Sequence, residues 1–258
     1  YIYKPTTFDV SGLKNTASNA WRNSVSLPLG SSGAAYSANW AGCIEERQTE
    51  RVTDSDPSDN WSPIIPAGAK DMDIDLVPST LDTTTQWGPI LDGVVYARYW
   101  NGTATTNTFT SNQMSSSTGQ VKQRNADCPA ASKLYQEWTP TNFDSYVSSL
   151  TANSYTYHDI GLLWGARLMS PTGIFAANNA PPDRDIQRHM VFMTDGDTNA
   201  NPGSTSYYDD APMYTAYGID YWDRRQNDGT SNPAKSWLDA NIDARTQAIC
   251  DWVKAKNI

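Results

Sequence analysis

The residues best placed to do chemistry in this sequence follow a short apolar run near position 190. His189-Met190-Val191-Phe192-Met193 is typical of a buried strand, and Thr194-Asp195-Gly196 is typical of an acidic turn that ends it. In an open α/β sheet, ligands bind beyond the carboxyl ends of the strands. Asp195 lies between a hydroxyl and a glycine that lets the backbone turn, so it is well placed to hold a hard cation. A strand followed by an ordinary Asp-Gly turn is an equally good interpretation.

A second hydroxyl comes from the loop before a predicted helix. Thr156 lies five residues before Gly161, at the start of that helix. A hydroxyl from this loop and the carboxylate of Asp195 could converge on Mg²⁺, which takes oxygen ligands and keeps positions open for water or a partner carboxylate. The sequence therefore predicts a partial Mg²⁺ site formed by Thr156 and Asp195.

The second half of the chain contains the elements that would position these loops. Helical periodicity is present at 141–150, 160–168 and 234–256. The strand at 190–193 precedes a long polar loop over about 199–233. Helix, helix, strand and helix in this order are typical of part of a doubly wound α/β domain. The residues expected on the apolar helix faces are Phe143, Val147, Leu150, Ile160, Leu163, Trp164, Ala166, Leu168, Leu238, Ile242, Ile249, Trp252 and Val253.

The first half, from residue 1 to about 130, is rich in Ser, Thr, Asn, Pro and Gly. Asp71–Val77 and Val94–Trp100 are typical of strands, and the first alternates acidic and apolar residues as a strand with one wet face would. Its aspartates do not indicate calcium, because no Asp-Gly loop or distal Glu completes an EF-hand. We expect one domain over 1–258, with a loop-rich elaboration before about residue 130 and a helix-helix-strand-helix core after it.

Composition excludes several classes of function. The chain has 258 residues and a net charge of −9. That charge argues against nucleic acids and anionic membranes, since binding to both needs clustered Lys and Arg. No stretch approaches the roughly 20 apolar residues of a membrane span. Both ends look cut, so we expect an interior piece of a longer protein of the cell envelope or exterior.

The chain has three cysteines. Cys43 and Cys128 lie in polar, loop-like contexts and could pair in an oxidising compartment. Cys250 lies in a helical pattern and is expected to be a buried thiol or to pair outside this chain. The Cys-x-x-Cys spacing of a structural zinc site is absent.

Several motifs together resemble one family. Residues 156–171 (TYHDIGLLWGARLMSP), followed by 193–196 (MTDG), are similar to the TadG-like Flp/Tad pilus-assembly proteins. The earlier segments 40–47 (WAGCIEER) and 127–129 (DCP) fit the same family in the right order. The resemblance implies a von Willebrand factor type A fold with a metal-ion-dependent adhesion site, built from an Asp-x-Ser-x-Ser loop, a Thr and an Asp. By position, Thr156 matches that Thr, and Asp195 matches that Asp.

The Asp-x-Ser-x-Ser loop has one candidate, Asp9-Val10-Ser11-Gly12-Leu13. Its fifth residue is Leu, and Pro5 weighs against a central strand before it, so we interpret it as a chance match and expect the true loop before Tyr1. The resemblance implies a non-enzymatic adhesion or assembly module of a bacterial Tad pilus system, on the periplasmic or extracellular side. It also implies a pilus or envelope protein as partner and a membrane anchor outside this chain.

Two other functions stay open. A hydrolase would use His158 in the Thr156 loop, since His189 opens the predicted strand and is expected to be structural; no Gly-x-Ser-x-Gly elbow accompanies His158. A carbohydrate-binding module would use the aromatic residues of the Tyr207–Trp222 loop to stack on sugars, although we favour the interpretation that they pack that loop onto the domain.

Overall fold

The chain has a mixed α/β structure that divides into two compact units, each assembled from three separate segments. Unit 1 contains Tyr1–Glu45, Gly88–Cys128 and Gly203–Asp223; unit 2 contains Glu46–Trp87, Pro129–Pro202 and Arg224–Ile258. The computed structural model describes residues 7–18, 20–28, 34–52, 57, 61, 65–91, 128–152, 155–179, 186–200, 215–218, 223–226 and 234–258.

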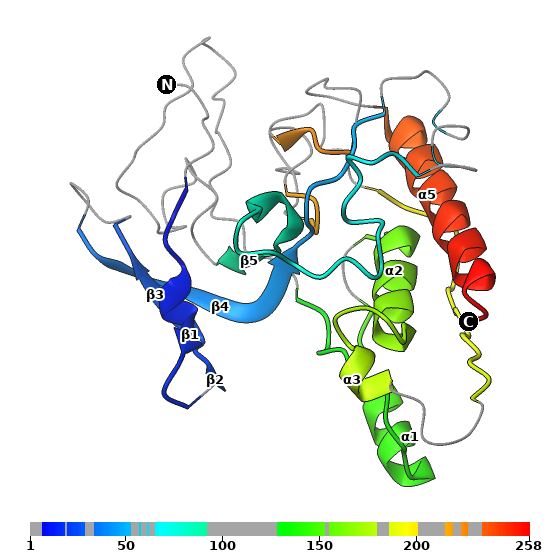
Figure 1. Cartoon of the computed structure of the whole chain (residues 1–258), viewed down its shortest axis with the longest axis horizontal. Helices are drawn as coiled ribbons and strands as arrows, with labels where there is room; N and C mark the ends of the chain where they lie inside the picture. Colours follow the sequence, from blue (N-terminus) through cyan, green and yellow to red (C-terminus); the bar gives the residue numbers. More distant parts are fainter. Residues whose placement is uncertain are drawn as a thin grey trace. The chain divides into compact units, whose positions relative to one another are not determined.

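Unit 1 is built on short antiparallel strands (Figure 1). One sheet pairs β1 with β2, and the other has the order β3-β4-β5. A small apolar cluster that includes Leu13, Leu27 and Leu91 stabilises this unit. Its elements are η1 (Ser11–Leu13), β1 (Lys14–Asn15), β2 (Ala20–Trp21), β3 (Ser24–Leu27), β4 (Tyr36–Glu45) and β5 (Gly88–Leu91).

A disulfide joins Cys43 on β4 to Cys128, with the two Cα atoms 5.7 Å apart. These are the two cysteines whose polar contexts suggested pairing. They lie 85 residues apart in the sequence, so the bond closes a long loop and restricts the unfolded chain. Gly42, the residue before Cys43, has a φ of +99°, and the pairing of β4 with β5 shifts register between Trp40 and Ile44.

Unit 2 contains the helices, and α2 (His158–Met169) packs beside α5 (Lys235–Ala255) (Figure 1). The helices predicted at 141–150, 160–168 and 234–256 are confirmed. The other elements are η4 (Thr83–Thr85), α1 (Pro140–Ser148) and α3 (Ala176–Asn179). The core consists of Val52, Trp61, Ala69, Met72, Ile74, Leu162, Leu163, Ala166, Ala248, Ile249 and Val253.

The apolar faces of the helices differ in how deeply they are buried. On α5, Leu238, Ile242 and Ile249 recur at helical spacing and are fully buried, which is why this stripe faces the core. On α1, Phe143 and Val147 are 52% and 45% exposed, so its apolar face is not covered by the described residues. The amphipathic pattern predicted α1 correctly but did not predict whether it is covered.

The predicted buried strand at 190–193 is wrong, because the segment carries no strand assignment and Val191 and Met193 are 82% and 85% exposed. Met190 does contact α2: a Cβ added to Gly165 would lie 3.6 Å from the Met190 sulfur. Among the described residues, no strand pairs with this segment. An apolar run becomes a buried strand only when a neighbouring strand covers its edges, and periodicity alone does not reveal the neighbour.

The predicted strand Asp71–Val77 is also wrong, since these residues form turns. Asp71 was expected on the solvent-facing side of a strand but is fully buried, and so is its neighbour Met72, a core residue. The other predicted strand, Val94–Trp100, lies outside the described residues. Both sheets of the described chain are antiparallel and belong to unit 1.

Candidate functional site

The loops that carry Thr156 and Asp195 are held together by backbone pairing. The Thr156 amide donates to the Asn199 carbonyl oxygen at 3.0 Å, and the Asn199 amide donates back to Thr156 at 3.0 Å. Asn199 follows Asp195 by four residues. The structure therefore brings together the two loops from which the sequence predicted a joint site.

His158, the first residue of α2, links the same two loops through its side chain. Its Nε2 lies 2.9 Å from the Thr194 hydroxyl, and its Nδ1 lies 2.9 Å from the Thr198 hydroxyl. The Thr198 hydroxyl in turn donates to the Asp243 carboxylate on α5. We call His158, Thr194, Thr198 and Asp243 the rim cluster.

Asp195 lies in an exposed turn beside this cluster. The Thr194 hydroxyl accepts a hydrogen bond from the Gly196 amide at 3.4 Å and donates one to the Gly196 carbonyl oxygen at 3.1 Å, so it closes the turn around Asp195. No hydrogen bond or ion pair occupies the Asp195 carboxylate in the part of the chain that the structure describes. This carboxylate is therefore accessible to a ligand.

The donor set at this rim suits Mg²⁺ chemically but is incomplete. Thr156 and Asp195 offer a hydroxyl and a carboxylate, the hard oxygen donors that Mg²⁺ takes. Within the described ranges, no group of three or more His, Cys, Asp or Glu side chains is placed to hold a metal ion. Any cation held here would take most of its ligands from water or from a partner.

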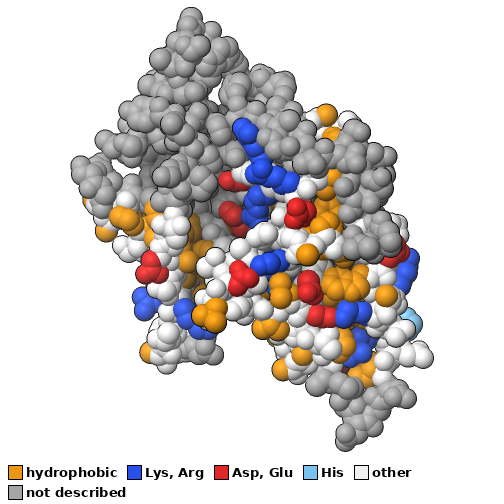
Figure 2. Space-filling view, turned by 45° about the horizontal axis from the view of Figure 1, so that its top comes forward, with side chains coloured by type: hydrophobic (Ala, Val, Ile, Leu, Met, Phe, Trp, Pro, Cys, Tyr) orange, Lys and Arg blue, Asp and Glu red, His pale blue; other side chains and the backbone are white. Residues whose placement is uncertain are grey.

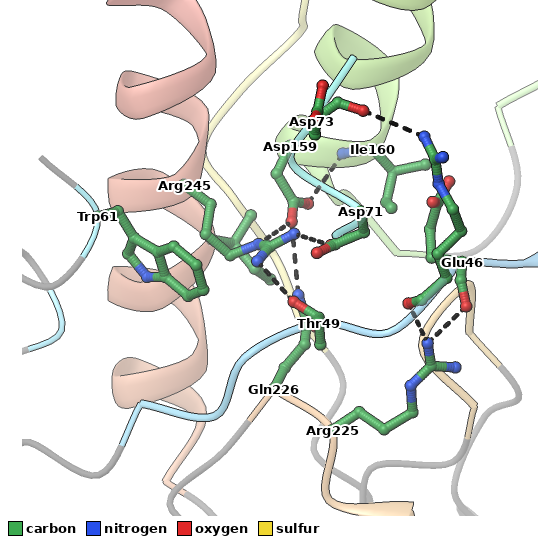
Figure 3. Close-up of polar contacts among 12 residues, drawn as sticks. Glu46, Thr49, Trp61, Asp71, Asp73, Asp159, Ile160, Arg225, Gln226 and Arg245 are labelled. Carbon is green, nitrogen blue, oxygen red and sulfur yellow. Dashed lines mark hydrogen bonds and ion pairs between the residues drawn. The ribbon is translucent and has the colours of Figure 1, made fainter. Parts of the chain in front are cut away.

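A second polar system lies in the interior of unit 2 (Figure 3). Glu46 accepts two hydrogen bonds from the Arg167 guanidinium, at 2.7 and 2.9 Å. It also accepts the indole N–H of Trp164 at 2.7 Å and that of Trp87 at 3.1 Å. All four donated hydrogens converge on one buried carboxylate, as its burial requires.

Arg245 on α5 joins two further carboxylates (Figure 3). Its Nη2 lies 2.5 Å from Asp71 Oδ2, and its Nε lies 2.8 Å from Asp159 Oδ2. Its Nη1 donates to the Thr49 hydroxyl at 3.0 Å, and its guanidinium lies 4.7 Å from the centre of the Trp61 ring. Glu46, Asp71, Asp159, Arg167 and Arg245 form what we call the buried charge network; the side chains of all five are at most 1% exposed.

The two ends of this network titrate differently. Burial alone raises the pKa of Glu46, but attraction to Arg167 and the hydrogen bonds from Arg167, Trp87 and Trp164 outweigh it and leave that pKa below its ordinary value. Burial raises the pKa of Asp71 above its ordinary value, because Arg245 only partly offsets the cost of desolvation and the Glu46 charge adds to it. Asp71 shares Arg245 with a second carboxylate, which explains the weaker compensation.

Sequence reasoning missed the buried charge network, although α5 carried a signal for it. Arg245 lies three residues after Ile242 and four before Ile249, in the middle of the apolar stripe. A charged residue at such a position must be paired, since an unpaired buried charge costs several kcal/mol (about 3–5). Arg167 follows Leu163 by four residues on α2 and carries the same signal.

The remaining predicted residues are not members of the rim cluster. His189 is exposed and does not open a buried strand, and Cys250 is a free, half-buried thiol beside the core. Asp9 belongs to unit 1, where its carboxylate accepts the Ser11 amide at 2.9 Å. Most of the Tyr207–Trp222 loop lies outside the described residues.

No helix in the described ranges is both long enough and apolar enough to span a bilayer. Comparison with known proteins adds no family to the resemblance described above. No family model matches the chain, and neither a curated protein nor a solved structure matches it significantly.

Proposed function

We propose that this chain is a non-enzymatic adhesion or assembly module of a bacterial envelope protein, von Willebrand A-like in fold and of the TadG-like kind. Its contact surface is the rim that carries Thr156 and Asp195. One observation carries the proposal: the Thr156 and Asp195 loops are joined by backbone and side-chain hydrogen bonds, while the Asp195 carboxylate stays accessible.

The proposed contact works through a shared cation. Thr156 and Asp195 hold Mg²⁺ weakly by themselves, because they provide two of the six positions that an octahedral ion fills. An acidic side chain of a pilus or envelope protein completes the shell and is held by it. Metal affinity is then low in the free protein and rises in the complex.

The disulfide between Cys43 and Cys128 supports a location on the periplasmic or extracellular side, where such bonds persist. The net charge of −9 opposes binding to an acidic partner unless a cation lies between the two. Acidic and basic side chains are interspersed on the face shown in Figure 2, as at a protein-binding rather than a nucleic-acid-binding surface. In this proposal the membrane anchor lies outside the chain.

Titration of the whole chain with Mn²⁺, followed by the paramagnetic relaxation of water protons, tests the assigned ligands. We expect saturable binding that Asp195→Ala abolishes and Thr156→Val weakens by about tenfold, the effect of about 1.4 kcal/mol. Asp251→Ala, which removes an exposed carboxylate from α5, is the matched control and leaves binding unchanged. Full affinity in Asp195→Ala would refute the role of that residue.

The contact between His158 and Thr194 supports one alternative, a hydrolase with a hydroxyl nucleophile beside an imidazole base. A panel of ester, peptide and glycan substrates tests it. Turnover that disappears in both His158→Gln and Thr194→Val would favour the hydrolase over the adhesion module.

A further inference from the structure

The hydrogen atoms of the rim cluster can be assigned one after another from the Asp243 end. The Thr198 hydroxyl has a single hydrogen, which it donates to the Asp243 carboxylate. It can therefore only accept from His158 Nδ1, 2.9 Å away, so Nδ1 carries the ring hydrogen. In the neutral imidazole, Nε2 carries no hydrogen, so its 2.9 Å contact with Thr194 forms when that hydroxyl turns its hydrogen from the Gly196 carbonyl oxygen to the ring.

This assignment gives the chain of hydrogen bonds a direction and an end point. The Thr194 hydroxyl lies against His158 Nε2 and bonds both the amide and the carbonyl oxygen of Gly196, so it ties the turn around Asp195 to the first residue of α2. The ring of Phe192 meets the His158 ring edge-on, with centres 5.7 Å apart, and limits its rotation. The side chain of Asp195, in contrast, takes no part in the hydrogen bonds of the rim cluster.

The base of the chain of hydrogen bonds is rigid. His158 begins α2 and Asp243 lies within α5, and these helices pack against each other through the core of unit 2. The next residue of α2, Asp159, is fixed to α5 by its ion pair with Arg245. The position of the turn is therefore fixed by two packed helices and not by another loop.

We propose that His158 is a positioning residue, which holds the Thr194–Gly196 turn so that Asp195 is presented to its ligand in a fixed orientation, with Thr198 and Asp243 setting the tautomer of the ring. The inference deepens the proposed function and rests on it for the identity of the ligand. It does not require His158 to touch metal or partner.

Imidazole nitrogen NMR tests the positioning independently of any ligand. The chain has two histidines, so His189→Gln leaves His158 as the only imidazole and also serves as the matched control. In alkaline buffer, where imidazoles are neutral, we expect the Nδ1–H tautomer to dominate. Asp243→Asn and Thr198→Val should each shift the ring toward the Nε2–H form that predominates in free histidine, and an Nε2–H tautomer in the parent protein would overturn the proposal.

Two substitutions of His158 separate its two contacts. Gln places its amide where Nε2 lies and can still meet Thr194, whereas Asn reaches only the Nδ1 position and can still meet Thr198. We expect amide hydrogen exchange at Asp195 and Gly196 to be about five- to tenfold faster in His158→Asn, as loss of one hydrogen bond implies, and close to normal in His158→Gln. Equal exchange in His158→Asn, His158→Gln and the His189→Gln control would overturn the positioning role.

The Mn²⁺ titration then connects the turn to the ligand. His158→Asn should weaken Mn²⁺ binding about five- to tenfold, and His158→Gln should restore most of it. Absence of Mn²⁺ binding by the parent protein would defeat the proposed function while the exchange experiment still decides on positioning. Normal Mn²⁺ affinity in His158→Asn, with a turn that exchanges faster, would overturn the inference.

Discussion

Two polar systems begin at consecutive residues of α2 and differ in almost every respect. His158 joins the rim cluster, where the Thr194 hydroxyl is exposed and most contacts are between neutral groups. Asp159 joins the buried charge network, where its carboxylate and the Arg245 guanidinium are both fully buried. Of these two neighbouring residues, His158 is partly exposed to solvent and Asp159 is buried.

The difference teaches which system stabilises the fold and which presents a surface. A group in the buried charge network has no water to replace a lost partner, so each removal leaves an uncompensated charge. Thr194, an exposed member of the rim cluster, can exchange its partner for water at small cost. We therefore expect substitutions in the network to act on folding and substitutions at the rim to act on binding.

The largest effect is expected from Arg245→Met. It leaves Asp71 and Asp159 buried without their shared cation, which should lower the free energy of unfolding by about 3–5 kcal/mol in urea denaturation. Lys235→Met removes the solvent-exposed partner of Asp239 and should have no measurable effect. Similar losses in the two variants would contradict the distinction between a buried and an exposed ion pair.

The next effect concerns the stability of the protein in acid, where Glu46 and Asp71 of the buried charge network should act with opposite signs. The pKa of Glu46 is lowered on folding, so its stabilising contribution is present above its ordinary value of 4.5 and is lost as the pH falls through the folded-state pKa. The pKa of Asp71 is raised above 3.8, so the folded state binds that proton more readily than the unfolded state and acidification is partly offset.

Urea denaturation between about pH 3 and 7 reads out these opposite signs as slopes. Glu46→Gln should flatten the loss of stability in acid, although it lowers stability at neutral pH by leaving Arg167 without its carboxylate. Asp71→Asn should steepen that loss. Three identical slopes in the parent protein and the two variants would show that neither carboxylate is linked to folding as the contacts indicate.

Two glycines extend the comparison to the backbone. A Cβ at Gly173 would lie 2.8 Å from the Ile74 carbonyl oxygen, in the segment that carries the network's Asp71, so Gly173→Ala should destabilise by about 1–3 kcal/mol. A Cβ at Gly165, within α2, would lie at an ordinary 3.6 Å from the Met190 sulfur. Gly165→Ala should therefore stabilise by about 0.5–1 kcal/mol through helix propensity, and thermal unfolding of both variants measures the pair. Destabilisation by Gly165→Ala would show that the contact between α2 and Met190 leaves no room for a methyl group.

A loss of stability smaller than that of Arg245→Met is expected from Thr198→Val. The substitution keeps the shape of the side chain but removes the hydroxyl between His158 and Asp243, at a cost of about 0.5–1.5 kcal/mol. Chemical denaturation gives this value, which should be well below that of Arg245→Met. A loss comparable to that of Arg245→Met would mean that the rim cluster is part of the stabilising core.

Sequence patterns predicted what depends on neighbours a few residues away. The helices α2 and α5 follow from apolar spacing, whereas the convergence of the Thr156 hydroxyl with the Asp195 carboxylate stays a prediction, since the structure joins these loops through the backbones of Thr156 and Asn199. The buried state of Asp71 depends on Arg245, 174 residues away, and could not be read from its alternating neighbours. The exposure of Val191 was missed for the same reason, since burial of a strand depends on a second strand that local periodicity does not specify.

The sequence separation between Asp71 and Arg245 has a consequence for folding during synthesis. A ribosome synthesises Asp71 and Asp159 long before the cation that both require, and 174 residues separate the first of them from it. The pairing of Asp71 with Arg245 can therefore form only after α5 has been synthesised.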